Sequence, residues 1–518
     1  MGSYFNPGNE KFQIDLNGKI YVDKTELICA TNECLHTPQR FFCVSRPRRF
    51  GKSMAVSMLM AYYSKGCDSK ELFKDLRINE ADCFLEHLNQ YDVIALNMQE
   101  FLSRSGSVEE MLERLQKLVM RDIKKEYPDI DYFDDTDLIQ SMQDIYGKTR
   151  CPFIVLIDEW DCVFREYRQY KEAQDKYLDF LRDFLKDREY IHLAYMTGIL
   201  PIKKYGTHSA LNMFTEFSML NTRQFTKFIG FTEEETEKLC MDLGRNFEEV
   251  KEWYNGYHFG DGISIYNPKS VVESALSGIC DTYWNQTETF EALRLYIDMN
   301  FEGLRDDVLS MMAGEKVRIN TGSFSNDMVT FCTKDDVLTL LIHLGYLGYD
   351  FDNESVYIPN NEIRREFFNA VSVSGWGEVS KALLHSAATL EAIWAGRTKQ
   401  VAEGIEQAHF ETSHIQYHDE NALSYTISLA LYTARNFYTI VREFPSGRGF
   451  ADMVFLDKPA LVVELKWDKS AKGAVEQIKN RQYCKSLAEY RGNILLVGVN
   501  YDKDTKVHSC VIEEAAKV

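Results

Sequence analysis

The chain has 518 residues, 45% of them hydrophobic, and a net charge of −20. This length predicts about two to four domains, and the apolar content is typical of a folded protein. No apolar run is long enough to cross a membrane, and the first residues lack an apolar signal core, so we expect a cytoplasmic protein without a membrane partner. The acidic balance excludes a general attraction to nucleic acid and confines any such contact to a local basic patch.

Cysteine and histidine spacings give little sign of a metal site. The 12 cysteines are scattered without a CxxC pair, which favours reduced thiols over disulfides or zinc. The 11 histidines are dispersed as well. His414 and His418 are four residues apart and can share a helix face, but no third metal ligand is evident beside them.

A phosphate-binding loop is predicted near the start of the chain. Residues 41–44 (FFCV) suit a short buried strand, and a basic loop, Gly51-Lys52-Ser53 and a helical run follow. This is the order of elements in phosphate-binding loops. Unpaired N–H groups at the start of a helix attract anions, and Gly51 allows the backbone to come close to a phosphate. Lys52 would reach the β- and γ-phosphates, and the Ser53 hydroxyl would hold Mg²⁺. Because Arg46 stands where the usual pattern has its first glycine, a strand followed by a capped helix is the alternative.

Two acids after a buried strand support nucleotide binding. Residues 154–157 (IVLI) form an apolar run that ends in Asp158 and Glu159, as in a fully buried parallel strand. Acids at the carboxyl end of such a strand lie in the crevice where α/β sheets bind ligands. Asp158 would contact the Mg²⁺ shell, and Glu159 would polarise the attacking water. A buried strand running into an acidic loop is the alternative, but together with the predicted phosphate loop the acids favour a nucleotide site.

Strands and helices alternate through the first 200 residues. Further strands are predicted at 92–98 and 191–196, and helices at 108–127, 135–146 and 172–188. This alternation predicts a parallel sheet with helices on both faces. Thr197 follows one of these strands and would either sense the γ-phosphate or be an ordinary strand-end threonine.

The middle of the chain has weaker signals. Residues 201–300 are predicted to be mainly helical and are rich in aromatic side chains. Residues 335–347 predict a helix and residues 349–358 a short hairpin, as in a winged-helix module. Such modules bind DNA in some proteins and pack against other domains in others. Because this segment is not basic, we expect packing.

A second site is predicted on a hairpin near the C-terminus. Helices are expected from about 375 to 436, a hairpin at 450–467, a helix at 472–489 and a strand at 493–499. A turn at Lys458 would place Asp452 directly opposite Glu464, with β-carbons about 5 Å apart. Lys466 is two residues after Glu464 and therefore points to the same face.

Opposed carboxylates repel each other unless a divalent cation lies between them. Hard oxygen ligands suit Mg²⁺ or Mn²⁺, which would activate water and neutralise a scissile phosphate beside Lys466. Glu464 and Lys466 also interrupt an apolar strand, where burial without a purpose would be costly. A surface hairpin with a Glu–Lys pair is the alternative. Other residues that extend the motif are Gly447, Arg448 and Gly449 before the hairpin, Glu420 as a further acid, and Gln477, Arg481 and Tyr483 after it.

These stretches together resemble a bacterial family that joins an AAA-ATPase-like N-terminal region to a C-terminal PD-(D/E)XK nuclease superfamily domain. The resemblance covers nearly the whole chain and rests on YVDKTELI, SRPRRFGKS, IVLIDEWD, the Thr197-Gly198 strand end, WYNGYHFG, IYNPKS, DDVLTLLIHLGYL, GRGFADMVFLDKPALVVELK and AVEQIKNRQY. It implies an α/β fold: a P-loop NTPase sheet of the ASCE/AAA type, a helical and winged-helix-like middle region, and a restriction-endonuclease-like domain. The implied segments are an ATPase domain at 1–200, a helical lid at 201–300, a winged-helix-like region at 301–372 and a nuclease domain at 373–518.

The resemblance also implies roles for individual residues. Arg46 in place of glycine is the family's own form of the loop. The nucleotide would be bound by Arg46, Pro47, Arg48, Arg49, Phe50, Gly51, Lys52, Ser53, Met54, Asp158 and Thr197, with Ser53 and Asp158 also holding Mg²⁺. The catalytic residues would be Glu159 for ATP hydrolysis and Asp452, Glu464, Lys466 and Gln477 for cleavage, with Asp452, Glu464 and Glu420 as metal ligands. Apart from the resemblance, residues 21–25 (YVDKT) precede a short helix-like segment and would either pack over the sheet edge or cover the nucleotide base.

The leading functional hypothesis is an ATP-dependent or ATP-regulated nuclease that cuts DNA, with defence against mobile elements as one role. A signalling NTPase switch, whose C-terminal domain binds nucleic acid or a partner without cutting, is the second hypothesis. A nuclease-fold domain that only binds nucleic acid is the third. The choice of ATP over GTP rests on the resemblance alone, and the sequence leaves open DNA against RNA and assembly into a homo-oligomer.

Overall fold

The structure of the chain is a computed structural model. It describes residues 2–202, 211–221, 223–260, 262–284, 289–299, 301–312, 314–325, 331–373, 377–411, 423, 426–428, 430–436, 438–446, 449–456, 459–482 and 493–515. The chain divides into two compact units, the first made of Met1–Thr289, Phe301–Gly303 and Arg318–Arg364, and the second of Phe290–Asn300, Leu304–Val317 and Arg365–Val518. The predicted division into four segments stays a prediction. Among the described residues, every helix is too short or too polar to cross a membrane.

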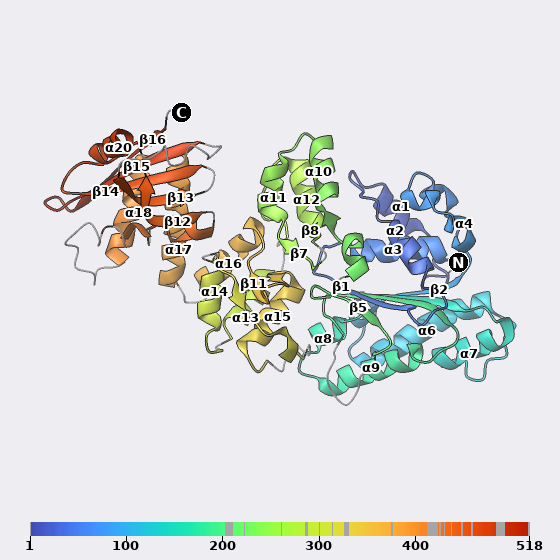
Figure 1. The fold of residues 1–518 in the computed structure, drawn as a ribbon. Coiled ribbons are helices and arrows are strands. Elements are labelled where there is room, and N and C mark those ends of the chain that lie inside the picture. Colours follow the sequence, from blue (N-terminus) through green and yellow to red (C-terminus); the bar gives the residue numbers. More distant parts are fainter. Residues whose placement is uncertain are drawn as a thin grey trace. The chain divides into compact units, whose positions relative to one another are not determined.

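The first unit is built around a five-stranded parallel sheet of order β2-β3-β4-β1-β5 (Figure 1). Its strands are β1 (Phe41–Ser45), β2 (Asp92–Asn97), β3 (Phe153–Asp158), β4 (Ile191–Gly198) and β5 (Thr215–Phe217). Every residue of β1 and β3 is buried, as expected of parallel strands covered on both faces. The four longer strands confirm the prediction. Strand β5 is not predicted from the sequence, because three residues are too few to show a hydrophobic pattern.

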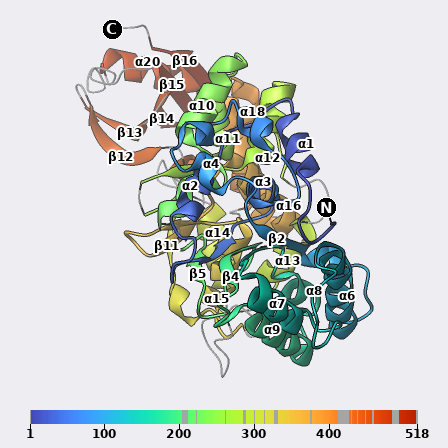
Figure 2. The same ribbon diagram turned by 90° about the vertical axis from the view of Figure 1, so that its right-hand side faces the viewer.

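Helices cover both faces of this sheet, as predicted (Figures 1 and 2). One face carries α1 (Glu10–Leu16), α2 (Glu26–Asn32), α3 (Lys52–Tyr63) and α4 (Phe84–His87), and the other carries α6 (Val108–Glu126), α7 (Leu138–Thr149), α8 (Cys162–Glu166) and α9 (Lys171–Leu185). The short α5 (Met98–Leu102) follows β2 directly. Helix α7 begins three residues later than predicted, because the Asp137 carboxylate accepts from the N–H groups of Ile139 and Gln140 and caps it.

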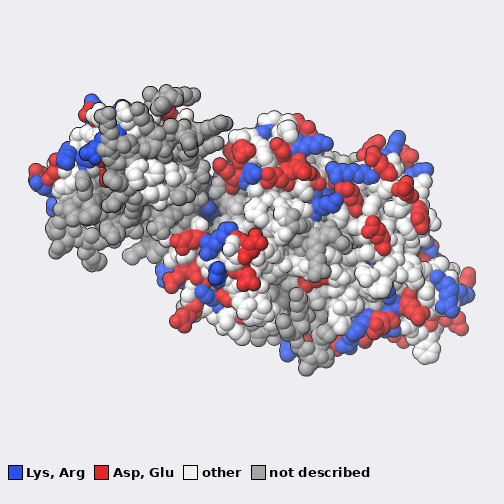
Figure 3. All heavy atoms as spheres, viewed as in Figure 1, with Lys and Arg blue, Asp and Glu red and all other residues white. Residues whose placement is uncertain are grey.

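A small antiparallel sheet and three helices follow the parallel sheet in the chain. The elements are β6 (Phe231–Thr232), β7 (Tyr257–His258), β8 (Ser264–Tyr266), α10 (Glu233–Asp242), α11 (Phe247–Tyr254) and α12 (Pro268–Ser277). The helices agree with the expectation for this region, whereas the three strands were missed because each has only two or three residues. On the face drawn in Figure 3, acidic side chains gather over these helices, and both signs of charge are interspersed elsewhere. A nucleic-acid contact on this face would therefore have to be local.

The predicted helix and hairpin are present in the first unit. Helix α15 (Lys334–Leu344) is followed by β10 (Gly348–Asp350), which pairs antiparallel with β11 (Ser355–Tyr357), and β9 (Val317–Arg318) lies beside β11. Residues 336–343 of α15 are all buried. A helix buried on every side cannot enter a DNA groove, so this arrangement agrees with the expected packing role.

The second unit contains a five-stranded sheet of order β12-β13-β14-β15-β16, in which only β14 and β15 pair in parallel. Its elements are β12 (Thr439–Ser446), β13 (Gly449–Leu456), β14 (Ala460–Trp467), β15 (Ile494–Asp502), β16 (Val507–Glu514), α13 (Thr289–Ile297), α14 (Leu304–Met312), α16 (Asn361–Val373), α17 (Gly377–Trp394), α18 (Thr398–Glu411) and α20 (Ala471–Asn480). Side chains of α18 share a core with one face of the sheet, and side chains of α20 share a second core with the other.

The register of the C-terminal hairpin agrees with the prediction. Met453 lies opposite Val463 and Val454 lies opposite Val462, which is the pairing expected from a turn centred on Lys458. Lys458 itself lies outside the described residues. Strands β12 and β16 are not predicted from the sequence, because these edge strands carry charged residues and, in β12, a proline that edges tolerate.

Candidate functional site

The predicted phosphate loop connects β1 to α3. Gly51, directly before the helix, has a φ of 90°, a left-handed conformation that glycine adopts without strain. The Lys52 ammonium is buried and donates to the carbonyl oxygens of Arg46 (3.0 Å) and Pro47 (2.8 Å). Burial lowers the pKa of Lys52, with Glu159 as the largest opposing influence. The lysine is therefore held at the start of α3, where its own loop supplies its acceptors.

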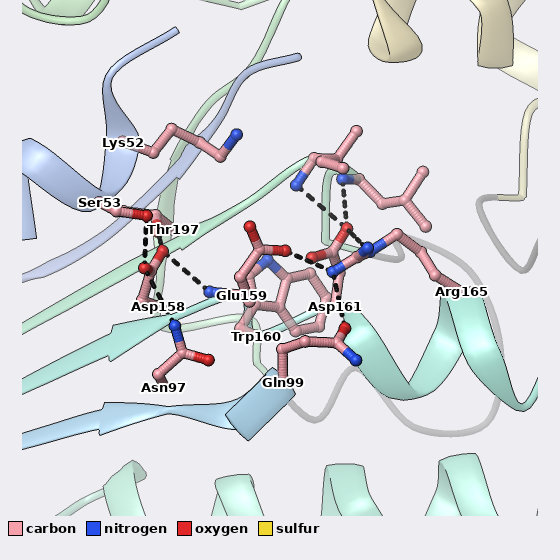
Figure 4. A network of polar contacts seen from close by, with 12 residues as sticks. Lys52, Ser53, Asn97, Gln99, Asp158, Glu159, Trp160, Asp161, Arg165 and Thr197 are labelled. Carbon is pink, nitrogen blue, oxygen red and sulfur yellow. Dashed lines mark hydrogen bonds and ion pairs between the residues drawn. The ribbon is translucent and has the colours of Figure 1, made fainter. Parts of the chain in front are cut away.

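Polar side chains at the carboxyl ends of three strands meet around Asp158 (Figure 4). The Ser53 hydroxyl donates to Asp158 Oδ2 at 2.7 Å, and the Thr197 hydroxyl donates to Oδ1 at 2.5 Å. Asn97, at the end of β2, donates to Oδ2 at 3.4 Å. The structure thus brings together three of the predicted site residues. Asn97 is not among the predicted site residues, although its position at the end of an apolar run could have indicated it.

Glu159 is held by an ion pair beside this cluster (Figure 4). Its backbone has a φ of 56°, which is uncommon for a residue with a side chain. Arg165 Nη2 pairs with the Glu159 carboxylate, and Arg165 Nε lies 3.4 Å from Asp161 Oδ2. The same Asp161 oxygen accepts from the N–H groups of Ile199 (3.0 Å) and Leu200 (2.9 Å). Burial raises the pKa of Glu159, and Arg165 opposes this.

Neither Arg165 nor Asp161 is among the predicted site residues. Their four-residue spacing matches a helix turn directly after the acidic motif, which was the available signal.

A cavity of about 890 Å³ opens at the phosphate loop, a volume within the usual range for small-molecule sites. Its lining includes Arg48, Arg49, Phe50, Gly51, Lys52, Ser53 and Met54 of the loop, together with Glu159 and Arg165. The apolar side chains of Ile20 and Val22, with Tyr21, also line it, which fits a surface that covers a nucleotide base. Hydroxyl and carboxylate oxygens at Ser53 and Asp158 are ligands of the kind that Mg²⁺ prefers.

Arg46 lies away from this cavity. Its guanidinium is fully buried and donates to the carbonyl oxygens of Ser45 (3.0 Å) and Phe217 (3.1 Å). It also lies 5.3 Å from the centre of the Phe259 ring. The side chain therefore braces the loop against β5, and only the carbonyl oxygen of Arg46 faces Lys52.

The second predicted site lies on β13, β14 and α20. Glu464 and Lys466 are buried neighbours on β14, with Lys466 Nζ 3.0 Å from Glu464 Oε1. Gln477 from α20 donates to the same Glu464 oxygen. Asp452 Oδ2 accepts from the N–H of Leu465 at 2.7 Å, which fixes this carboxylate next to Glu464. The structure therefore brings together the four residues predicted to be catalytic at this site.

The Glu464 carboxylate is poised for a cation. Burial raises its pKa, and the neighbouring Asp452 raises it further, whereas Lys466 opposes the shift. Its second oxygen, Oε2, is buried and accepts from no hydrogen-bond donor in the described part of the chain. An unpartnered carboxylate oxygen beside a second carboxylate fits a hard divalent cation such as Mg²⁺ or Mn²⁺.

Several predicted residues lie outside the described part of the chain. These are the further acid Glu420, the pair His414 and His418, and Gly447, Arg448 and Tyr483 beside the nuclease motif. Arg481 is described and ends α20, where its charge lies close enough to Glu464 to lower the pKa of that carboxyl.

Comparisons with known proteins match the two regions of the chain that contain these sites. Residues 8–207 match the family model described as a predicted AAA-ATPase, and residues 420–510 match the PD-(D/E)XK nuclease superfamily model. An uncharacterised protein from the vnfD 5′ region of Azotobacter chroococcum mcd 1 is 24% identical over 285 residues. That similarity covers 52% of this chain and 51% of the relative, so the chain spans about half the length of the curated relative it matches.

A solved structure, Cdc6p from Pyrobaculum aerophilum, aligns with 69% of this chain and 93% of its own at 8% identity. Its TM-score of 0.25 is too low to establish a shared fold. The family matches identify the two regions instead. The parallel sheet with its phosphate loop and the C-terminal sheet with its clustered carboxylates agree with those matches. One polypeptide therefore carries a region that matches the predicted AAA-ATPase model and a region that matches the PD-(D/E)XK nuclease superfamily model.

Proposed function

We propose that this protein binds and hydrolyses ATP at the phosphate loop and uses that nucleotide to control a metal-dependent nuclease site that cuts DNA. Defence against mobile elements is the role that we propose for such cutting. The ATPase and nuclease regions are supported by the family matches. The proposal adds the nucleic-acid substrate, the metal dependence and the coupling of the two sites.

One observation carries the nuclease proposal: Glu464 is buried beside Asp452 with one carboxylate oxygen that has no partner in the described residues. Burying a carboxylate in this way costs free energy unless a ligand completes its shell. Mg²⁺ held by Asp452 and Glu464 would supply charge neutralisation and an acidic bound water. Lys466 would hold the scissile phosphate, and Gln477 would keep Glu464 in place.

Cleavage assays with matched variants test this proposal. Linear, circular and single-stranded DNA would be incubated with Mg²⁺ or Mn²⁺, with and without ATP. We expect the wild-type protein to cut, Asp452→Asn to lose cutting, and Lys52→Ala to lose only its dependence on ATP. Asp468→Asn, which changes an acid just beyond β14, is the control and should cut normally. Cutting that survives in Asp452→Asn, or no cutting of any substrate, would contradict the proposal.

A nucleotide-controlled switch is the second candidate, and the ion pair of Glu159 favours it. In the structure Arg165 holds the Glu159 carboxylate, so this acid is engaged and not available to polarise a water. A protein in this state would bind ATP and turn it over slowly, with release of Glu159 as the controlling step.

The Arg165→Ala variant separates the two candidates. If Arg165 restrains Glu159, ATP turnover should rise several-fold in Arg165→Ala and fall to background in the double variant with Glu159→Gln. If Arg165 instead orients Glu159 for hydrolysis, both single variants should lose turnover equally. Equilibrium binding of ATP, measured in parallel, shows whether either variant has damaged the cavity itself.

A further inference from the structure

Two histidines and a glutamate meet at the contact between α18 and β16. Glu406 and His409 come from α18, and His508 comes from β16, about a hundred residues later. His508 Nδ1 lies 2.6 Å from Glu406 Oε2, and ligand atoms of all three side chains lie within 4.8 Å of one another. The His508 side chain is fully buried and Glu406 is 30% exposed.

This cluster is separate from the candidate nuclease site. Cys510 and Ile512 of β16 pack with the core that α18 shares with the sheet, and His508 alternates onto the same face. Val462 of β14 and Ile478 of α20 pack on the opposite face. Glu464 has the same strand parity as Val462, so the nuclease residues and the histidines lie on opposite sides of the sheet.

The donor set suits a borderline transition metal. Two imidazole nitrogens and one carboxylate oxygen form a ligand set that binds Zn²⁺ with a fourth position left for water. Glu406 and His409 are three residues apart on a helix and therefore share a face.

We propose that Glu406, His409 and His508 form a Zn²⁺ site that fastens helix α18 to the edge strand β16. Ligand atoms of a tetrahedral zinc site lie about 3.3 Å apart, so closure needs movements of no more than about 1.5 Å. Because the ligands come from segments distant in sequence, the ion joins them only in the folded unit. Zinc binding is then coupled to the stability of the second unit, and not to the chemistry of the nuclease site.

Zinc titration of the full-length protein tests the site. Protein stripped with a chelator would be titrated with Zn²⁺ by calorimetry, in excess Mg²⁺ so that the carboxylate and phosphate-loop sites are occupied. We expect His409→Ala and Glu406→Gln each to weaken one Zn²⁺ equivalent more than about 100-fold, since loss of a supporting partner alone costs about 10- to 100-fold. The control is Glu403→Gln, one turn earlier on α18 and largely exposed, which should bind as the wild type does.

Two further readouts test the same site and leave the buried His508 unchanged. Co²⁺ bound in place of Zn²⁺ should give visible absorption bands in wild type and Glu403→Gln that are lost in His409→Ala. Zn²⁺ should also raise the unfolding temperature of wild type and not that of His409→Ala. Equal zinc affinity in His409→Ala and Glu403→Gln would overturn the proposal and leave Glu406 and His508 as a plain ion pair.

Discussion

Lys52 and Glu464 present the same physical problem at the residue scale, because each is an ionisable side chain with little access to water. Lys52 is 5% exposed and Glu464 is 2% exposed. Burial disfavours the charged form of each group, so it lowers the pKa of the lysine and raises that of the glutamate. A bound phosphate beside Lys52, or a cation beside Glu464, would favour the charged form. Both residues are thus arranged to respond to a ligand.

Replacement of Lys52 should remove most of the affinity for ATP. Hydrogen bonds to charged groups contribute about 1.5–3 kcal/mol, so Lys52→Ala should weaken binding roughly 10- to 150-fold. Calorimetric titration with ATP and Mg²⁺ measures this change. Lys74→Ala, at a side chain that is 66% exposed, serves as the control. Unchanged ATP affinity in Lys52→Ala would place the nucleotide elsewhere.

The raised pKa of Glu464 predicts a specific dependence of stability on pH. The folded protein holds this proton more tightly than the unfolded chain, whose glutamates titrate near about 4.3. The contribution of this bound proton to the unfolding free energy is therefore complete below that pH. It is lost as the pH rises through the higher pKa that Glu464 has in the folded protein.

In metal-free protein, the unfolding free energy of wild type relative to Glu464→Gln should fall over this pH range. Denaturant unfolding of both proteins at a series of pH values measures the difference. Addition of Mg²⁺ above the range should stabilise wild type and leave Glu464→Gln unchanged. A pH-independent difference would mean that Glu464 has the same pKa in both states.

At the scale of elements, each site depends on how a helix meets a strand. Helix α3 begins directly after the loop from β1, which sets Ser53 opposite the end of β3. Helix α20 packs closely on β14 and β15, which brings Gln477 onto Glu464. Gly498 of β15 allows α20 to lie this close to the sheet, since a β-carbon there would collide with the carbonyl oxygen of Ala471. The close approach of the α20 and β15 backbones, and not only the identity of the side chains, therefore positions the residues of the candidate nuclease site.

Adding a methyl group at Gly498 should disturb the nuclease site from a distance. Gly498→Ala would push α20 away from the sheet, at a cost of about 1–3 kcal/mol for overpacking, and would separate Gln477 from Glu464. We expect lower stability of the second unit and slower cutting, with unchanged ATP binding. Gly147→Ala in α7, where a β-carbon meets nothing within 4 Å, is the control. Normal cutting by Gly498→Ala would show that α20 does not position the site.

At the scale of the whole molecule, the two candidate sites belong to different compact units. The nucleotide cavity lies wholly in the first unit, and the carboxylate cluster and the proposed zinc ligands lie in the second. The net charge of −20 and the acidic side chains over α10 to α12 oppose nucleic acid in general. Binding of DNA would thus depend on local groups such as Lys466 and would weaken with added salt.

ATP should stabilise the two units unequally. A ligand present at 100 times its dissociation constant adds about 2.7 kcal/mol to the unit that binds it. Calorimetric unfolding with ATP and Mg²⁺ should therefore move the transition of the first unit upward and leave the other in place. Lys52→Ala, which binds ATP more weakly, should show a smaller shift of this transition. Equal movement of both transitions in wild type would show that the units unfold as one, contrary to this expectation.

The sequence by itself determined the main elements of both sites. The parallel strands, the loop ending in Gly51-Lys52-Ser53 and the pairing that sets Asp452 beside Glu464 all follow from local patterns. Interactions between residues close in sequence are sufficient to define these elements, because hydrophobic runs predict buried strands and a hairpin's register follows from the position of its turn. The short strands β5 to β8 and the polar edge strands β12 and β16 escaped prediction, since pairing partners and not their own composition hold them in place.

Only the tertiary structure decided which distant residues meet. Arg46 turns away from the cavity to brace β5, and Glu406 reaches His508 across about a hundred residues. No spacing in the sequence marks these contacts, because they are produced by the packing of helices on sheets. The zinc ligands illustrate the reason: each is an unremarkable residue in its own segment, and only the fold places their nitrogen and oxygen atoms around one point.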